Sequence, residues 1–224
     1  MKRRYDAIGL DMDGTLLNTK VNYTGLSNLI FSELAKMGVP DELMSRSEGA
    51  KFSIDGATGY LIRAGRAEEV WEMERRIKDA ALVIEMENVH LARPFPGAVK
   101  VLEDLKDEGY SIGVLTRGSR HYAEAALKTA GVCDLLDALV CRDDYHESEA
   151  KPSPLAMDYL AEELGTESSR ILYVGDHRFD HDCAKASGAG FVAVLSGTFN
   201  REDWAELGNG FPIIETVASL PEVF

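Results

Sequence analysis

Residues 9–15 constrain this chain more than any other segment. A short apolar run ends at Asp11, and Asp13 and the turn residue Gly14 follow directly. Residues two apart on a strand face the same side, so the two carboxylates converge if Asp13 remains extended. Two carboxylates in one pocket require a cation, a shared proton, or both. The segment therefore predicts a strand that ends in an acidic site.

The net charge of −14 over 224 residues limits the partners of the protein. This acidic balance argues against nucleic acid and anionic membrane surfaces, which require a basic face. An anionic substrate must then be held locally, by a metal or a few cationic side chains. The three cysteines form no CxxC pair, so a reducing compartment is the simplest interpretation. With no signal-peptide pattern and no stretch as long as a membrane span, we expect a cytoplasmic protein.

Short apolar runs alternate with helical patterns over most of the chain. This alternation is typical of a parallel sheet with helices on both faces, an α/β fold with a Rossmann-like, three-layer core. One helix is expected to end at Gly131, and Ser153 with Pro154 begins another. The expected strands are residues 7–11, 111–115, 138–141, 171–174 and 191–195.

Residues 22–92 interrupt the alternation with helical patterns and no convincing strand. The clearest helix carries one apolar stripe, formed by Val70, Met73, Ile77, Ala80, Ala81 and Ile84. A polar turn precedes this region and a proline-rich segment follows it, and the two could act as a hinge. We therefore expect a core of residues 1–18 and 94–224, with residues 19–93 as an inserted helical domain.

Polar residues follow four of the expected strands: Asp11, Thr116, Lys151 and Asp176. In an open parallel sheet, ligands bind beyond the carboxyl ends of the strands, so these residues are expected to share one site. Asp11 and Asp176 suit a hard cation such as Mg²⁺. Thr116 and Lys151 suit the oxygens of a phosphoryl group, and backbone N–H groups near the same strand ends can add donors.

These motifs resemble those of haloacid dehalogenase superfamily phosphatases, in the phosphoglycolate phosphatase-like branch with a helical (type 1) cap. The DxDGT signature is residues 11–15, the strand-end threonine is Thr116, the lysine is Lys151, and the GDxxxD motif is residues 175–180. The insertion resembles the cap in position and helicity only. The resemblance implies a Mg²⁺-dependent phosphomonoesterase for a small phosphorylated metabolite, with phosphoglycolate-like acids ahead of sugar phosphates and nucleotides.

The resemblance also implies roles for four aspartates. Asp11 would be the nucleophile that forms an aspartyl-phosphate, and Asp13 would be the acid and base. Asp11, the backbone carbonyl of Asp13, and Asp176 would bind the metal. Asp180 would orient the metal's waters or Lys151.

The phosphate-binding residues implied by the resemblance are Thr116 and Lys151. Arg117 is a further candidate, since it stands where many relatives carry Asn. It either contacts the phosphate or closes over the site, or it is a surface arginine. His177 either faces the metal site or leaving group, or is a solvent-facing loop histidine, which we expect. No role is assigned to Arg178.

The insertion offers candidates for substrate selection. Residues 47–51, with Arg63 and Arg66, could reach a substrate carboxylate or a second phosphate. The alternative for these residues is a solvated helix face.

Two other functions stay open. A phosphomutase of the β-phosphoglucomutase type would need a cap that shields the phosphoenzyme from water, and a non-catalytic binding module would keep the fold alone. By the resemblance, dehalogenase chemistry is disfavoured because those relatives lack the acid-base residue that Asp13 would supply. A monomer and a homodimer are both compatible with the sequence.

Overall fold

The computed structural model describes residues 3–45 and 49–223. The chain divides into two compact units. One consists of Met1–Lys20 and Val89–Phe224, and we call it the sheet unit. The other, Val21–Asn88, is the helical unit.

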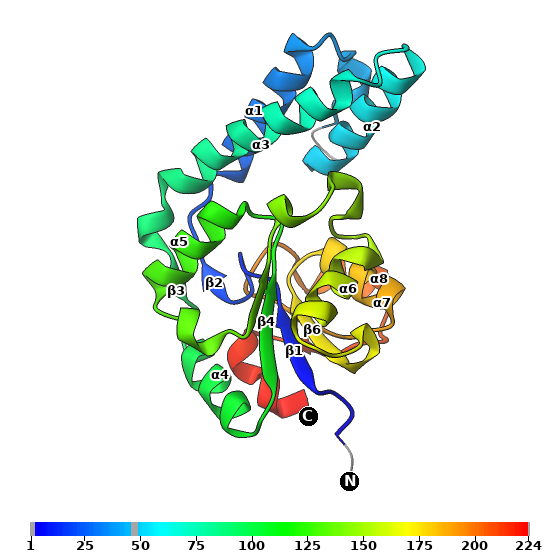
Figure 1. Ribbon diagram of the computed structural model, residues 1–224. Coiled ribbons are helices and arrows are strands. Elements are labelled where there is room, and N and C mark those ends of the chain that lie inside the picture. The colour runs from blue at the N-terminus through cyan, green and yellow to red at the C-terminus, as the bar shows by residue number, and fades with distance from the viewer. Residues whose placement is uncertain (1–2, 46–48, 224) are drawn as a thin grey trace. The chain divides into compact units, whose positions relative to one another are not determined.

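Parallel strands form the sheet of the sheet unit, in the order β5, β4, β1, β6, β7, β8 (Figure 1). Their bounds are β1 Ala7–Leu10, β4 Ser111–Leu115, β5 Ala138–Val140, β6 Ile171–Gly175, β7 Gly190–Val194 and β8 Ile213–Ile214. The order runs outward from β1 in both directions, first to β4 and β6. A sheet of this topology binds ligands at the carboxyl end of such a switch point. The α/β class predicted from the sequence is confirmed.

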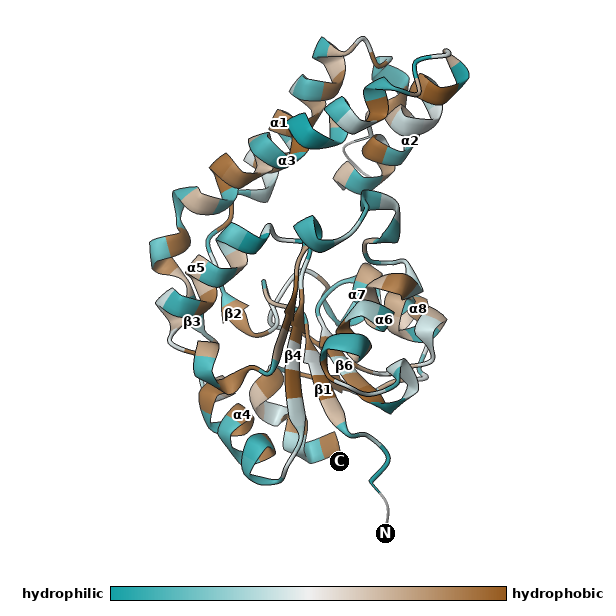
Figure 2. Ribbon diagram, viewed as in Figure 1, coloured by the Kyte–Doolittle hydropathy of each residue, from teal (hydrophilic) through white to brown (hydrophobic). Residues whose placement is uncertain are grey.

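Helices cover both faces of this sheet (Figure 1). They are α4 Ala98–Asp107 and α5 Arg120–Ala130 on one face, and α6 Pro154–Glu163, α7 Arg178–Ser187 and the short α8 Arg201–Leu207 on the other. Ser119 caps α5 by accepting a hydrogen bond from a backbone N–H, and Gly131 ends that helix at a φ of 72°. Hydrophobic residues follow the strands and hydrophilic ones the outer helix surfaces (Figure 2). Burial on both faces explains why the strand sequences are almost continuously apolar.

A short antiparallel ribbon lies where the chain leaves and re-enters the sheet unit. β2 (Leu17–Asn18) pairs with β3 (Arg93–Pro94). From the sequence we expected a polar turn and a proline-rich hinge here, because two-residue strands have no periodicity and proline is rare in sheets. The pairing keeps Arg93 with the sheet unit, so the border expected between residues 93 and 94 falls inside β3.

The helical unit contains α1 Tyr23–Lys36, α2 Gly49–Arg63 and α3 Glu69–Glu87. Its core includes Leu34 of α1, Leu61 of α2 and Met73 of α3, all fully buried. The apolar stripe expected on α3 therefore faces the other two helices. The Glu33 carboxylate of α1 also lies 2.8 Å from the Arg76 guanidinium of α3. Apolar burial provides most of the stability of such a unit.

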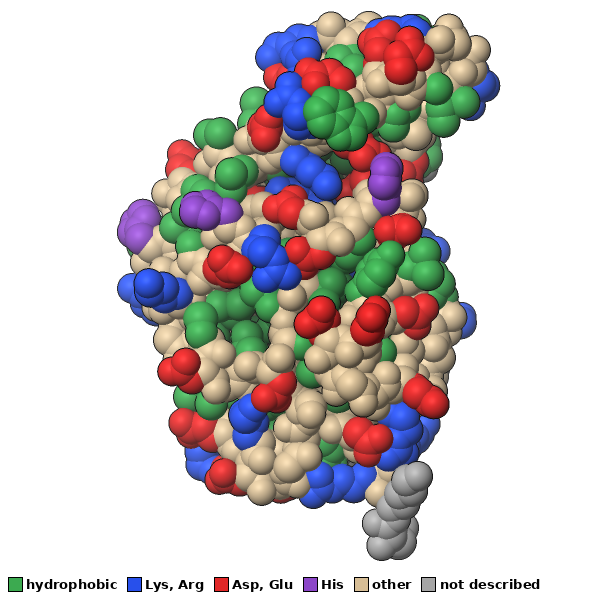
Figure 3. Space-filling view, viewed as in Figure 1, with side chains coloured by type: hydrophobic (Ala, Val, Ile, Leu, Met, Phe, Trp, Pro, Cys, Tyr) green, Lys and Arg blue, Asp and Glu red, His purple; other side chains and the backbone are tan. Residues whose placement is uncertain are grey.

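Acidic and basic side chains are interspersed over the face of the molecule in Figure 3. Exposed ion pairs of this kind contribute about 0–1 kcal/mol each, so the buried cores dominate stability. Within the described part of the chain, no helix combines the length and the apolar character needed to cross a membrane.

Candidate active site

The end of β1 positions the first two aspartates. The backbone N–H of Asp11 bonds the Val174 carbonyl at 2.9 Å, which continues the sheet one residue past the strand. The turn after Asp13 uses Gly14 at a φ of 84°, a conformation that other residues rarely adopt. A Cβ at Gly14 would also lie 2.8 Å from Oδ2 of Asp176. Glycine is thus required for the turn and for the close approach of a second carboxylate.

Lys151 lies at the centre of a buried polar cluster. Its Nζ is 2.6 Å from Oδ1 of Asp11 and 2.7 Å from Oδ1 of Asp180. The carbonyl oxygen of Leu115 and the hydroxyl of Tyr173 each lie 2.9 Å from the same Nζ. Burial works against the charged ammonium, but Asp11 and Asp180 outweigh it and raise the pKa of Lys151. The two carboxylates therefore favour the charged ammonium.

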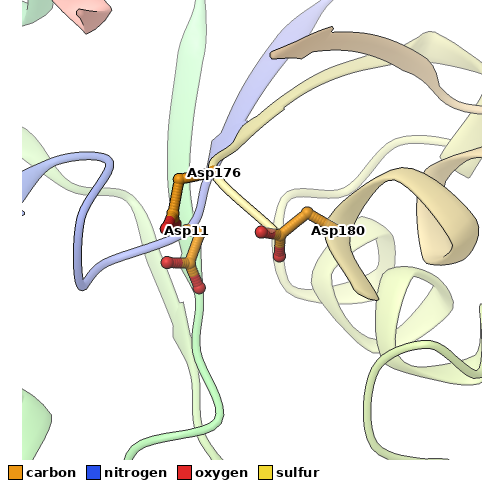
Figure 4. A group of neighbouring side chains, drawn as sticks. All are labelled: Asp11, Asp176 and Asp180. Carbon is orange, nitrogen blue, oxygen red and sulfur yellow. The ribbon is translucent and has the colours of Figure 1, made fainter. Parts of the chain in front are cut away.

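Three carboxylates converge at this end of the sheet (Figure 4). Asp11 and Asp176 follow the neighbouring strands β1 and β6, and Asp180 lies in the first turn of α7. One oxygen of each lies within 4.8 Å of the others. Burial raises the pKa of Asp11, with Lys151 opposing it, and burial with nearby Asp180 raises the pKa of Asp176.

These charges do not cancel. With all three carboxylates ionised, one ammonium leaves two negative charges uncompensated in this buried site. An oxygen-only ligand set with this excess charge fits a hard divalent cation such as Mg²⁺. The acidic cluster predicted from the sequence therefore exists, and it is suited to a metal.

Asp176 is held by segments distant in sequence. Thr15 donates its hydroxyl to Oδ1 at 3.1 Å, and the backbone N–H of Thr198 donates to Oδ2 at 2.6 Å. A Cβ at Gly197 would lie 2.1 Å from the same Oδ2, so this loop can approach only as glycine. Thr198 and Gly197 were not predicted from the sequence, although a glycine just after the end of a buried strand is a signal for close backbone approach.

The carboxylate of Asp13 has different partners. Its Oδ1 accepts hydrogen bonds from the hydroxyls of Tyr122 and Thr19, each at 2.5 Å. Tyr122 belongs to α5 and is almost completely buried. Asp11 is thus joined in the acidic cluster by carboxylates of the GDxxxD motif, while Asp13 is fixed by two hydroxyls. The sequence did not reveal Tyr122, because a tyrosine on a helix is usually a packing residue.

Thr116 and Arg117 directly follow β4. Thr116 is buried, and its Oγ1 accepts a hydrogen bond from the backbone N–H of Gly118 at 3.0 Å. The Arg117 guanidinium donates to the Lys151 carbonyl at 2.8 Å and to the Glu147 carboxylate at 2.7 Å. Arg117 is not a simple surface arginine, because it holds the segment that carries Lys151.

His177 corrects one expectation. It is half-buried at the start of α7, between the rings of Phe179 and Phe199 at 4.6 and 5.1 Å, and its Nδ1 accepts from the backbone N–H of Phe179. The expectation of a solvent-facing loop histidine is wrong, because the two aromatic rings cover part of the imidazole. Burial lowers the pKa of His177, which favours the neutral ring. Arg178 is exposed and pairs with Asp182 at 3.1 Å.

The residues of the insertion that were candidates for substrate selection bond within the helical unit, are exposed, or lie outside the described residues. Residues 47 and 48 lie outside the described residues. Arg66 donates two hydrogen bonds to the Glu69 carboxylate at 2.6 Å, so it serves the helical unit itself. Arg63 is exposed, and Lys51 bonds a carboxylate one turn along α2.

Known proteins are similar to this chain in sequence and in fold. The model of the haloacid dehalogenase-like hydrolase family matches residues 8–194. The chain belongs to this family. The hydrolase is 30% identical over 210 residues to an N-acetylmuramic acid 6-phosphate phosphatase of Pseudomonas aeruginosa, covering 91% of this chain and 88% of that protein. It is 30% identical over 224 residues to a phosphoglycolate phosphatase of Rhodospirillum rubrum, covering 96% and 88%.

A solved structure of a hydrolase from Pseudomonas syringae has a TM-score of 0.67 and 20% identity, with 97% of each chain covered. The family and the enzyme class predicted from the sequence, a phosphatase of the haloacid dehalogenase superfamily, are therefore confirmed.

Proposed function

We propose that this hydrolase removes the phosphoryl group from a small phosphomonoester of a carboxylic acid, with Mg²⁺ as cofactor. The observation that carries the proposal is the buried group of three carboxylates at the carboxyl ends of β1 and β6, two of which, Asp11 and Asp180, contact the Lys151 ammonium. The substrate class comes from the relatives, because phosphoglycolate and N-acetylmuramic acid 6-phosphate both combine a phosphate ester with a carboxylic acid.

Asp11, Asp176 and the backbone carbonyl of Asp13 are the proposed metal ligands, with Asp180 placed to hold Lys151 or a metal-bound water. Bound there, Mg²⁺ would neutralise the charge that keeps a carboxylate and a phosphate apart. The raised pKa of Asp11 supports this role, because burial favours the protonated carboxyl in spite of Lys151, and a divalent cation would favour its charged form.

Asp11 is the proposed nucleophile. Lys151 holds its Oδ1 at 2.6 Å, so attack on phosphorus falls to Oδ2. A bond forms between Oδ2 and phosphorus as the ester oxygen leaves, which gives an aspartyl-phosphate and splits hydrolysis into two steps. Water then attacks the phosphorus and restores the carboxylate.

Asp13 is the proposed acid and base. It would protonate the leaving oxygen and then accept a proton from the attacking water. Tyr122 and Thr19, which both donate to Oδ1, would hold this carboxyl in position. Thr116 and Lys151 would hold the phosphoryl oxygens. Arg117 would act indirectly, because its hydrogen bond to the Lys151 carbonyl holds the segment that carries Lys151.

The test is phosphate release from a panel of phosphomonoesters with and without a carboxylate, in Mg²⁺ and in EDTA. We expect Mg²⁺-dependent release, a preference for the carboxylated esters, and at least a thousandfold loss of kcat, roughly, in Asp11→Asn. Asp79→Asn, an exposed aspartate of α3 paired with Arg75, is the matched control.

Two results would contradict the proposal. Release that survives in both EDTA and Asp11→Asn would exclude this site. Isomerisation of a sugar phosphate without net phosphate release would instead identify a mutase.

A further inference from the structure

Tyr173 crosses the sheet beneath the proposed catalytic site. It belongs to β6, yet its hydroxyl donates to the carbonyl of Leu115 in β4 at 2.8 Å, although β1 lies between these two strands. The ring passes Gly9, its partner in the β1–β6 register. A Cβ at Gly9 would come within 2.8 Å of the ring carbon Cδ2. The absence of a side chain at Gly9 therefore allows the phenol to reach β4.

The hydrogen-bond donors around Lys151 can be counted. An ammonium has three protons, and Nζ has four oxygen neighbours: Asp11, Asp180, the Leu115 carbonyl and the Tyr173 hydroxyl. The phenol contributes one further proton and an oxygen that accepts. If each proton is used once, Lys151 donates to the two carboxylates and to the phenol oxygen, and Tyr173 donates to the Leu115 carbonyl.

We propose that Tyr173 keeps the third ammonium proton of Lys151 available to the phosphoryl group. The inference rests on the proposed function, because the phosphoryl group is the anion that Lys151 would meet. With the phenol present, the Leu115 carbonyl has its own donor. The third proton rests on the phenol oxygen, a weak acceptor, and can turn to a phosphoryl oxygen without leaving a buried carbonyl unpaired.

Without the phenol, the same proton has a competing partner. In Tyr173→Phe the ring still fills the space over Gly9. The Leu115 carbonyl, which lies 2.9 Å from Nζ, would then accept a hydrogen bond from the third ammonium proton. Binding a phosphoryl group would then cost the carbonyl its donor. Tyr173 is thus a positioning residue that acts through Lys151.

The experiment is calorimetric titration of inorganic phosphate into the full-length protein with Mg²⁺. We expect Tyr173→Phe to weaken phosphate binding by roughly tenfold, the effect of about one hydrogen bond to a charged group. Tyr159→Phe is the matched control, because its hydroxyl bonds the Glu149 carboxylate at 3.1 Å, in the segment after β5. A purely structural role would lower the melting temperature without changing phosphate affinity.

A second measurement uses the native sequence and does not depend on the variant folding. Thr116 is the only threonine that follows a leucine, so labelling leucine carbonyls with ¹³C and threonine nitrogens with ¹⁵N isolates the Leu115 carbonyl signal. On adding phosphate we expect the ¹³C shift of this carbonyl to stay in the range of a hydrogen-bonded carbonyl, because Tyr173 keeps its bond to the carbonyl. A small shift caused by phosphate beside Thr116 is expected in either case.

The outcomes separate the two hypotheses. Equal phosphate affinity in Tyr173→Phe, a Leu115 carbonyl that takes the ¹³C shift of an unbonded carbonyl with phosphate, or no phosphate binding by the native protein would each overturn the inference. Weakened phosphate binding in the variant, in a protein that hydrolyses no phosphomonoester, would support the inference and reject the proposed function.

Discussion

The Tyr122 hydroxyl donates a hydrogen bond to Oδ1 of Asp13 at 2.5 Å, although 109 residues separate the two in sequence. Tyr122→Phe should lower kcat by roughly tenfold and change KM little, because the bond orients the proposed acid-base carboxylate and does not touch the phosphate. Steady-state kinetics on the best substrate tests this. A rise in KM at constant kcat would contradict it.

Thr19 donates to the same oxygen, so the two hydroxyls can partly replace each other. We expect Thr19→Val with Tyr122→Phe to lose more activity than the product of the single losses. A double-variant cycle measures the coupling, and simple multiplication of the two effects would show that each hydroxyl acts independently.

Gly197→Ala should disrupt the proposed metal site. The new methyl group would lie 2.1 Å from Oδ2 of Asp176, and the loop or the carboxylate would have to move. We expect Mg²⁺ affinity to fall roughly 10- to 100-fold, as when other supports of a metal ligand are lost. Gly210→Ala is the control, because no atom lies within 4 Å of a Cβ there. The Mg²⁺ dependence of phosphate release checks both variants, and equal Mg²⁺ requirements would refute this prediction.

Lys151→Met should destabilise the protein in a pH-dependent way. The change leaves Asp11 and Asp180 buried without their cation, which costs about 3–5 kcal/mol when the carboxylates are ionised. Burial already raises the pKa of Asp11, and Lys151 opposes that rise. A carboxyl whose folded pKa exceeds its unfolded pKa favours folding at low pH, and this stability is lost as the pH rises through the folded pKa.

The decrease in the free energy of unfolding caused by Lys151→Met should therefore be larger at about pH 8 than at about pH 5. Urea denaturation in EDTA measures it at both values, with the exposed Lys100→Met as the control. An equal loss of stability at both pH values would contradict the interpretation that Lys151 compensates the charges of Asp11 and Asp180.

Glu33 should stabilise the helical unit above its folded pKa. Hydrogen bonds from Lys36 and then Arg76 lower the pKa of Glu33, so its stabilisation is present above the unfolded pKa and is lost as the pH falls through the folded one. We expect Glu33→Gln to cost about 0.5–1 kcal/mol at neutral pH and almost nothing in acid. Thermal unfolding over this pH range tests it. Glu215→Gln, at an exposed pair with Arg201, should have no measurable effect at either extreme.

The sheet could be predicted wherever a strand and its flanking helix were long enough to show a pattern. β4, β6 and α5 fall where the apolar runs and the terminal glycine placed them. β8 has two residues and no periodicity, so it was missed. The short α8 was missed as well, although Asn200 and Asp203 form a capping box that marks its start.

The site divides in the same way. Asp11, Lys151 and Asp176 could be predicted because they follow strands that end at one edge of a parallel sheet. Tyr122 and Tyr173 could not, because their hydroxyls lie on elements that look like ordinary core segments. Their contacts depend on which strands are neighbours, and that order is a property of the tertiary fold.

The β2–β3 ribbon has a consequence for how this enzyme can diversify. Because Leu17–Asn18 and Arg93–Pro94 are paired, the chain leaves and returns through adjacent strands, and the ends of the intervening segment are held together independently of its length. Each doubling of the length of a segment closed in this way raises the entropic cost of closing it by only about 0.6 kcal/mol. Evolution can therefore lengthen, shorten or replace residues 21–88 while the strand register of the sheet unit stays unchanged.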